Sequence, residues 1–166
     1  MIETYDNRKL RMSKDAFLEK IAMQFRLLQQ SFDALDEAAA ARLNLNRTDL
    51  RCLDVVLGGG PLSAGAIATA LKLSPAATTT VIDRLERAGY VLRSRDVANR
   101  RRVLVDATDA ARKVEEEIYL PVGQAGAQAL QRYDEEQLTM ILDFLQTARQ
   151  VQEEQTTRIS TSPEHR

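Results

Sequence analysis

The sequence predicts a mainly α-helical protein with one small β-hairpin. Ala, Leu, Glu, Gln and Arg are abundant and favour helices, whereas aromatic residues make up only 5% of the chain and Trp is absent. Apolar residues recur every three or four positions in long stretches towards both ends. Between these stretches, short helical patterns lead into two strand-like runs joined by a polar turn. The length of 166 residues suggests one domain.

A long amphipathic helix is predicted for residues 14–44, with Ser13 as its N-cap. One apolar stripe follows the helical period and contains Phe17, Ile21, Phe25, Leu28, Phe32 and Leu35. A helix of this length cannot bury its stripe on a small core alone. We therefore expect another helix, from this chain or from a partner chain, to cover it.

Residues 45–108 are predicted to form a central domain of three short helices and the hairpin. Thr48 is expected to cap the first helix, which the sequence GGGP at residues 58–61 ends. Ser63 is expected to cap the second helix. Ser74 caps the third, and the proline that follows it takes the first helical position, where its missing N–H costs no hydrogen bond.

The third helix, from Pro75 to about Arg87, divides into two faces. The apolar face contains Ala77, Thr78, Val81, Ile82, Leu85 and Ala88. The other face contains Ala76, Thr79, Thr80, Asp83 and Arg87, with Arg84 on the flank. Gly89 suits the left-handed position after the helix. Strands are predicted at 90–96 and 102–106, with 97–101 as the turn.

Two further helices are predicted within residues 109–156. Thr108 or Asp109 caps the first, which runs to about Leu130 and is expected to bend or break at Pro121. Asp134 with Gln137 resembles a capping box that begins a last helix to about Gln155. The polar residues 157–166 are expected to be a disordered tail. Terminal helices around a central domain are well placed to form a shared dimer layer.

Positive charge is concentrated in one segment of a chain whose net charge is only −1. Residues 83–102 contain seven arginines and three acidic residues, whereas 112–143 contain three basic and seven acidic residues. Such asymmetry is typical of a protein with one DNA-docking face. A capped helix followed by an arginine-tipped hairpin is the arrangement of a winged helix-turn-helix, flanked here by N- and C-terminal dimerisation helices.

Double-stranded DNA is therefore the expected partner. Thr79 and Thr80 offer a hydroxyl and a methyl group to base edges, and the hairpin arginines reach phosphate or the minor groove. Asp96 is expected to orient Arg100 or Arg101. Arg84 has two interpretations, a phosphate contact or a pairing along its own helix near Glu86. The expected DNA-binding residues are Ser74, Ala76, Thr79, Thr80, Arg84, Arg87, Arg95, Arg100 and Arg101.

Several other classes of protein are disfavoured. Cys52 is the only cysteine and is interpreted as a small apolar residue at the edge of the packed face. His165 is the only histidine, so we expect no metal site, no cofactor and no histidine-based active site. No apolar run is long enough to cross a membrane, and the N-terminus lacks the apolar segment of a signal peptide, which points to the cytoplasm.

The segment from about Leu45 to Ala111 resembles the MarR family of bacterial transcriptional regulators. The matching sequences are LxxxxLRCL, AIATALKLSPAATTTVIDRLERAGYV and RSRDVANRRRVLVDAT. The family's wing reads Asp, two residues, Asp, Arg, Arg. Here those places are taken by Asp96, Asn99, Arg100 and Arg101, so that Asn99 departs from the acid. Ala107 and Ala111 replace a Leu and a Gly that are usual in relatives.

The resemblance implies a homodimer that binds a pseudo-palindromic operator. Many relatives repress transcription and release DNA when a small, often phenolic, ligand enters a crevice beside the dimer layer. Phe17, Phe25, Phe32 and Tyr119 are candidates to line such a crevice, although helical spacing favours core or dimer interface for the phenylalanines. Relatives that sense oxidation carry the reactive cysteine in the first helix, where this chain has none.

The favoured interpretation is a sequence-specific DNA-binding regulator that acts as a ligand-responsive repressor. The alternative is a protein-interaction adaptor on a winged-helix scaffold, which would expose an apolar face on the helix from Pro75. An enzyme is disfavoured, because Glu115, Glu116 and Glu117 form a solvated face and the glycines at 58–60 lack the following Lys-Ser/Thr of a phosphate-binding loop.

Overall fold

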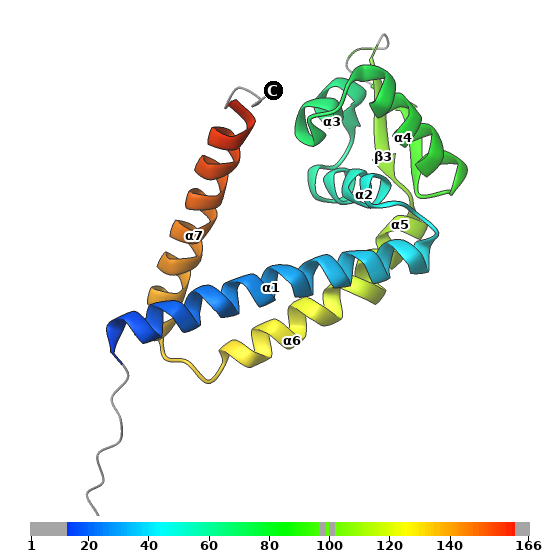
Figure 1. Ribbon diagram of the computed structural model, residues 1–166. Helices are drawn as coiled ribbons and strands as arrows, with labels where there is room; N and C mark the ends of the chain where they lie inside the picture. The colour runs from blue at the N-terminus through cyan, green and yellow to red at the C-terminus, as the bar shows by residue number, and fades with distance from the viewer. Residues whose placement is uncertain (1–12, 97–98, 100–101, 162–166) are drawn as a thin grey trace, which may run out of the picture. The chain divides into compact units, whose positions relative to one another are not determined.

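The computed structural model describes residues 13–96, 99 and 102–161. It confirms a mainly helical chain with one small antiparallel sheet. Whereas the length suggested one domain, the chain forms two compact units, Met1–Val114 and Glu115–Arg166. The first unit contains α1 to α5 and the sheet, and the second contains α6 and α7 (Figure 1).

The first unit begins with the long helix α1, Lys14–Leu43. Its predicted N-cap is confirmed, since the Ser13 hydroxyl accepts a hydrogen bond from the Ala16 N–H at 3.2 Å. The helix α2, Arg47–Gly59, follows. The prediction that Thr48 caps α2 is wrong: the Asn46 side-chain oxygen accepts the Asp49 N–H at 2.9 Å. The helix thus begins two residues earlier than Thr48 would allow.

The helices α3, Ala64–Leu71, and α4, Pro75–Arg87, form the helix-turn-helix. Ser63 and Ser74 cap them as predicted, accepting hydrogen bonds at 3.2 Å from N–H groups three residues on. Gly89 follows α4 with φ +81°, which confirms its left-handed position. The start of each helix is therefore determined by a hydrogen bond between residues three positions apart.

The sheet contains three strands in the order β1-β3-β2. The predicted hairpin is confirmed as β2, Val91–Arg95, and β3, Val103–Ala107, with Arg93 opposite Val105. The strand β1, Leu62–Ser63, pairs with the other edge of β3 and was not predicted. A strand of two residues is too short to show an alternating pattern.

The core of the first unit lies where α2, α3 and α4 pack around β3 (Figure 1). Thr78 is buried as predicted, and its hydroxyl donates to the Ser74 carbonyl at 2.9 Å. The largest fully buried apolar side chains are Leu50, Leu53, Ile67, Ile82, Leu85, Val56 and Val105. One face of α4 is thereby fixed to the rest of the unit.

Cys52 lies inside this core with no exposed surface, rather than at its edge. Its predicted packing role is confirmed. Burial, and to a lesser extent the charge of Asp49, raises the pKa of the Cys52 thiol to about 11. Because the thiolate is the reactive form, this cysteine is inert at neutral pH.

The helix α5, Asp109–Val114, ends the first unit, and Thr108 caps it by accepting the Ala111 N–H at 3.3 Å. The second unit starts with a π-helical turn, Glu115–Tyr119, and continues as α6, Leu120–Leu130. Pro121 lies in the first turn of α6, so the expected break takes the form of a change in helix type. A proline donates no backbone hydrogen bond, and the wider π turn accommodates that loss.

The last helix, α7, spans Glu135–Thr161. Its capping box is confirmed: the Gln137 N–H donates to Asp134 at 2.8 Å, and the Asp134 N–H donates to the Gln137 side chain at 3.1 Å. The expectation of disorder is wrong for residues 157–161, which are helical, and 162–166 lie outside the described residues. Hydroxyls in this stretch donate to carbonyls four residues back, such as Ser160 to Thr156 at 2.8 Å, which is compatible with a helix.

Large apolar side chains are exposed along several helices. Phe17 and Phe32 on α1 are 53% and 56% exposed, and only Ala39 and Ala40 of this helix are buried. Further exposed residues include Leu18, Ile21 and Leu28 on α1 and Met140, Leu142, Phe144, Leu145 and Val151 on α7. Within the described part of the chain, no helix is both long and apolar enough to span a membrane. Such faces are suited to packing against another helix, from this chain or from a partner chain.

The capping of α2 yields a first test. We expect Asn46→Ala to lower the free energy of unfolding by about 1 kcal/mol, because the variant lacks the N-cap hydrogen bond. Thr48→Ala is the matched control, and its effect should stay below about 0.5 kcal/mol. Urea unfolding followed by circular dichroism measures both. A larger effect of Thr48→Ala than of Asn46→Ala would contradict the observed cap.

The burial of Cys52 yields a second test. At pH 8, we expect iodoacetamide to label the native protein at least about 100-fold more slowly than the denaturant-unfolded protein, because the native thiol is protonated and inaccessible. Mass spectrometry of timed samples measures the two rates. Equal rates would show that Cys52 is accessible in the folded state.

Candidate nucleic-acid interface

The outer face of α4 is exposed along its length. Ala76, Thr79, Thr80 and Arg87 are all exposed, whereas Thr78, Val81, Ile82 and Leu85 are buried beneath them. The two faces predicted from the sequence are therefore confirmed except at Ala88, which was assigned to the apolar face and is exposed. The structure brings four of the expected DNA-binding residues together on one surface.

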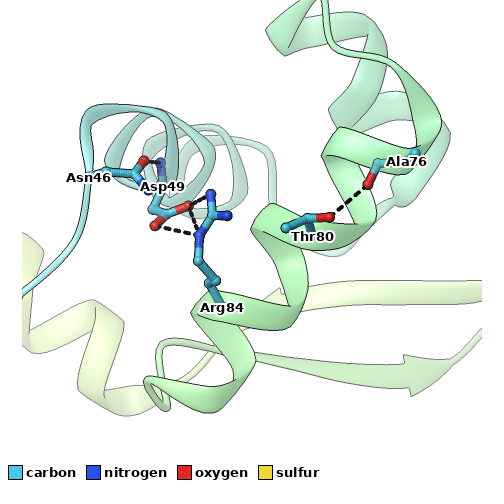
Figure 2. Close-up of polar contacts among 5 residues, drawn as sticks. All are labelled: Asn46, Asp49, Ala76, Thr80 and Arg84. Atoms are coloured by element: carbon cyan, nitrogen blue, oxygen red, sulfur yellow. Dashed lines mark hydrogen bonds and ion pairs between the residues drawn. The ribbon is translucent and has the colours of Figure 1, made fainter.

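The threonine hydroxyls on this face are already oriented. Thr79 donates to the Pro75 carbonyl and Thr80 to the Ala76 carbonyl, each at 3.0 Å; Figure 2 shows the second bond. With its proton used in this way, each oxygen presents acceptor lone pairs, and each side chain also carries a methyl group. This combination suits the amino groups of cytosine or adenine and the methyl group of thymine.

Ser74 lies exposed at the start of α4, and its hydroxyl caps the helix through the Ala77 N–H at 3.2 Å. The predicted capping role is thus confirmed. Its predicted role near a phosphate oxygen stays a prediction, and it rests on the partial positive charge of a helix N-terminus.

Arg84 does not pair along its own helix, as one interpretation of the sequence had it. Its guanidinium binds Asp49 of α2 in a forked arrangement (Figure 2). Arg84 Nε lies 3.0 Å from both carboxylate oxygens, and Nη2 lies 2.6 Å from Oδ1. The hydrogen bonds to Asp49 raise the pKa of Arg84 above its ordinary value. A phosphate contact by this residue stays untested.

A second set of ion pairs joins α4 to the wing. Arg93 of β2 binds Asp83 at 2.5 Å and also binds Glu86. Asp83 and Glu86 lie one helical turn apart on α4, so a single guanidinium bridges them. The helix is thus tied by arginine–carboxylate contacts to α2 on one side and to β2 on the other.

At the wing, the backbone closes through hydrogen bonds from the Asp96 N–H to the Arg102 carbonyl at 2.9 Å and from the Arg102 N–H to the Asn99 carbonyl at 2.8 Å. The Asp96 carboxylate lies 4.0 Å from the Arg102 guanidinium. Arg100 and Arg101 lie outside the described residues. The expectation that Asp96 orients one of them therefore stays a prediction, and Arg102 is one partner of Asp96 among the described residues.

These pairings change the charge that the segment offers to a ligand. Arg84, Arg93 and Arg102 are each engaged with a carboxylate. Arg87 and Arg95 are exposed and, among the residues that the structure describes, have no acidic partner. Within the described segment, these two arginines are the ones available to a phosphate.

A groove of about 590 Å³ lies beside Thr80. It is lined by Asn46, Arg47, Thr48, Leu73, Ala77, Thr80, Val81 and Arg84. The first turn of α2 and its cap contribute three of these residues, for which the sequence carried no functional signal. Arg47 binds Asp33 of α1 at 2.6 Å, so this turn also contacts the long helix. Among the described residues, no cluster of His, Cys, Asp and Glu is suited to hold a metal ion.

Comparison with known proteins identifies this arrangement. Residues 45–103 match the model of the MarR family. The HTH-type transcriptional regulator YcgE of Bacillus subtilis (strain 168) is 36% identical over 143 residues, which cover 86% of this chain and 93% of that protein. The chain belongs to the MarR family. It is therefore a DNA-binding transcriptional regulator with a winged-helix fold.

Solved structures of MarR-like fold agree with this assignment. The YusO protein from Bacillus subtilis has a TM-score of 0.61 at 22% identity, covering 84% of this chain and 99% of that one. A MepR F27L mutant of S. aureus, solved bound to an oligodeoxyribonucleotide, has a TM-score of 0.55 at 17% identity, covering 79% of this chain and 96% of that one. At these identities the similarity shows the fold alone.

Proposed function

We propose that this MarR-family protein binds a pseudo-palindromic operator as a homodimer and represses transcription in the cytoplasm. The observation that carries the proposal is the exposed outer face of α4, where Thr79 and Thr80 present acceptors and methyl groups. In this arrangement α4 enters the major groove, and the β2–β3 wing contacts phosphate or the minor groove. The oligodeoxyribonucleotide bound to the MepR mutant supports the same use of the fold.

The homodimer is supported by the exposed apolar stripe of α1. Phe17, Ile21, Leu28 and Phe32 follow the helical period and are exposed. Leaving such a surface in water is unfavourable by about 25 cal/mol per Å². A second copy of the chain offers the same stripe, and two copies place two recognition helices about 34 Å apart on successive major grooves.

Ligand response is the remaining part of the proposal, and it rests on the family resemblance. A small aromatic or phenolic effector would favour a dimer in which the two copies of α4 are not spaced to enter adjacent major grooves. Binding of the effector would then lower the affinity for the operator, and binding of the operator would lower the affinity for the effector. Phe17 and Phe32 are exposed and Phe25 and Tyr119 are half-buried, which leaves all four as candidates for an effector site.

The adaptor alternative predicts a large apolar surface on α4. The outer face carries Ala76, Thr79, Thr80 and Arg87 instead, and no large apolar side chain of α4 is exposed. An adaptor would also show no affinity for duplex DNA. Footprinting on the region upstream of the gene therefore discriminates between the two functions.

Two variants should separate affinity from sequence preference. We expect Arg95→Ala to weaken binding to all duplexes alike and to reduce the salt dependence of log K by about 0.9 for each phosphate that it no longer neutralises. Thr80→Val replaces the hydroxyl by a methyl group, which removes the acceptor oxygen together with its bond to the Ala76 carbonyl, and should change the preference among operator bases. Fluorescence anisotropy at several salt concentrations measures both. If Arg95→Ala binds like the parent protein, the wing assignment is wrong.

The dimer is tested by a charge placed in the apolar stripe. We expect Phe32→Glu to convert a dimer into a monomer in sedimentation experiments, because burying an unpaired carboxylate in the interface is costly. Gln30→Glu is the matched control, since residue 30 lies on the opposite side of α1. A parent protein that sediments as a monomer would contradict the proposed assembly.

A further inference from the structure

The ion pair between Asp49 and Arg84 links the N-terminal turn of α2 to the exposed side of α4 (Figure 2). Asp49 is 2% exposed, so its carboxylate cannot reach DNA. Arg84 lies one helical turn after Thr80 and is 36% exposed in its side chain. The pair therefore joins a buried charge to the helix that faces the operator.

Asp49 depends on this one guanidinium. It occupies the third position of α2, where the helix dipole favours a carboxylate and where its N–H donates to the Asn46 side chain at 2.9 Å. Both of its carboxylate oxygens accept hydrogen bonds from Arg84. A buried carboxylate without such a partner is strongly unfavourable. Arg84 must consequently keep its position whenever the domain is folded.

The apolar contacts beneath α4 do not determine its orientation to the same degree. Val81, Ile82 and Leu85 contribute burial, which is a non-directional interaction. A forked arginine–carboxylate pair has a defined geometry and limits both rotation and sliding of the helix. Base recognition needs side chains placed within about 0.5 Å of the productive position.

We propose that Arg84 is a positioning residue for operator recognition, which orients the outer face of α4 through the buried carboxylate of Asp49. This inference rests on the proposed function, in which α4 reads base edges. It replaces the sequence-based expectation that Arg84 itself binds phosphate. Nε and Nη2, two of the three nitrogens of its guanidinium, are committed to Asp49.

The decisive variant is Asp49→Asn, because it changes a residue that cannot touch DNA. The amide preserves the size of the side chain but removes the charge and one of the two acceptor oxygens. We expect affinity for the operator to fall about tenfold, comparable to one mismatched base pair in the site. Affinity for a random duplex of equal length should change less than about threefold, and the salt slope should stay the same, since the variant neutralises the same phosphates.

The operator for this experiment is a duplex selected from random sequences with the parent protein, and binding is measured by anisotropy at a temperature where circular dichroism shows all proteins folded. If Arg84 were a phosphate contact, Asp49→Asn would release its guanidinium, and binding to both duplexes would stay equal or become tighter. Either of those results overturns the proposal. Glu153→Gln is the matched control, since it removes a carboxylate from the exposed Arg149–Glu153 pair on α7.

A second variant covers the case in which Asp49→Asn lowers the folded fraction. Asp49→Leu combined with Arg84→Met replaces the pair by apolar side chains, an exchange that folded proteins often tolerate. We expect it to fold, to lose operator preference and to keep the salt slope of the parent. If the slope of log K against log salt concentration fell by about 1.8, which corresponds to one phosphate for each of two protomers, the result would instead show that Arg84 contacts DNA. A parent protein that selects no duplex would refute the proposed function, which is a separate outcome.

Discussion

The buried carboxylate of Asp49 is the constraint on which the recognition surface depends. It is placed by the cap of α2, and its charge requires the Arg84 guanidinium of α4. The apolar face of α4 covers the core of α2, α3 and β3 at the same time. The helix that carries the outer face is thus held on its opposite side by packing and on its flank by a directional ion pair.

Arginines in this chain serve two physical roles, and the structure separates them. Arg84 and Arg93 bind carboxylates within the domain and tie α4 to α2 and to β2. Arg87 and Arg95 remain exposed without an acidic partner among the described residues. The number of arginines in the sequence therefore overstates the charge available to DNA. A protein with a net charge of −1 gains affinity only where such unpaired arginines gather.

Most features determined by neighbours in the sequence were predictable, with the cap of α2 at Asn46 as an exception, whereas the features determined at long range were not. The caps at Ser13, Ser63 and Ser74 and the capping box at Asp134 each involve residues three positions apart. Asp49 and Arg84, by contrast, are 35 positions apart. From the sequence, an acidic residue in the first turn of a helix predicts only a favourable interaction with the helix dipole. The same reason explains β1, whose two residues form a strand only because β3 lies beside them.

The same contrast explains why the sequence predicts the packing of the central helices but not that of the long helix α1. The central helices have an apolar side that this chain itself buries, so composition and period determine the packing. The helix α1 buries only Ala39 and Ala40 and leaves Phe17 and Phe32 in solvent. Its stripe is not covered within the first unit, and in the proposed homodimer residues such as Phe32 would pack against the second copy. In the proposed homodimer, the distance between the two copies of α4 depends on how the two stripes meet, so DNA specificity would combine the chemistry of α4 with the geometry of α1.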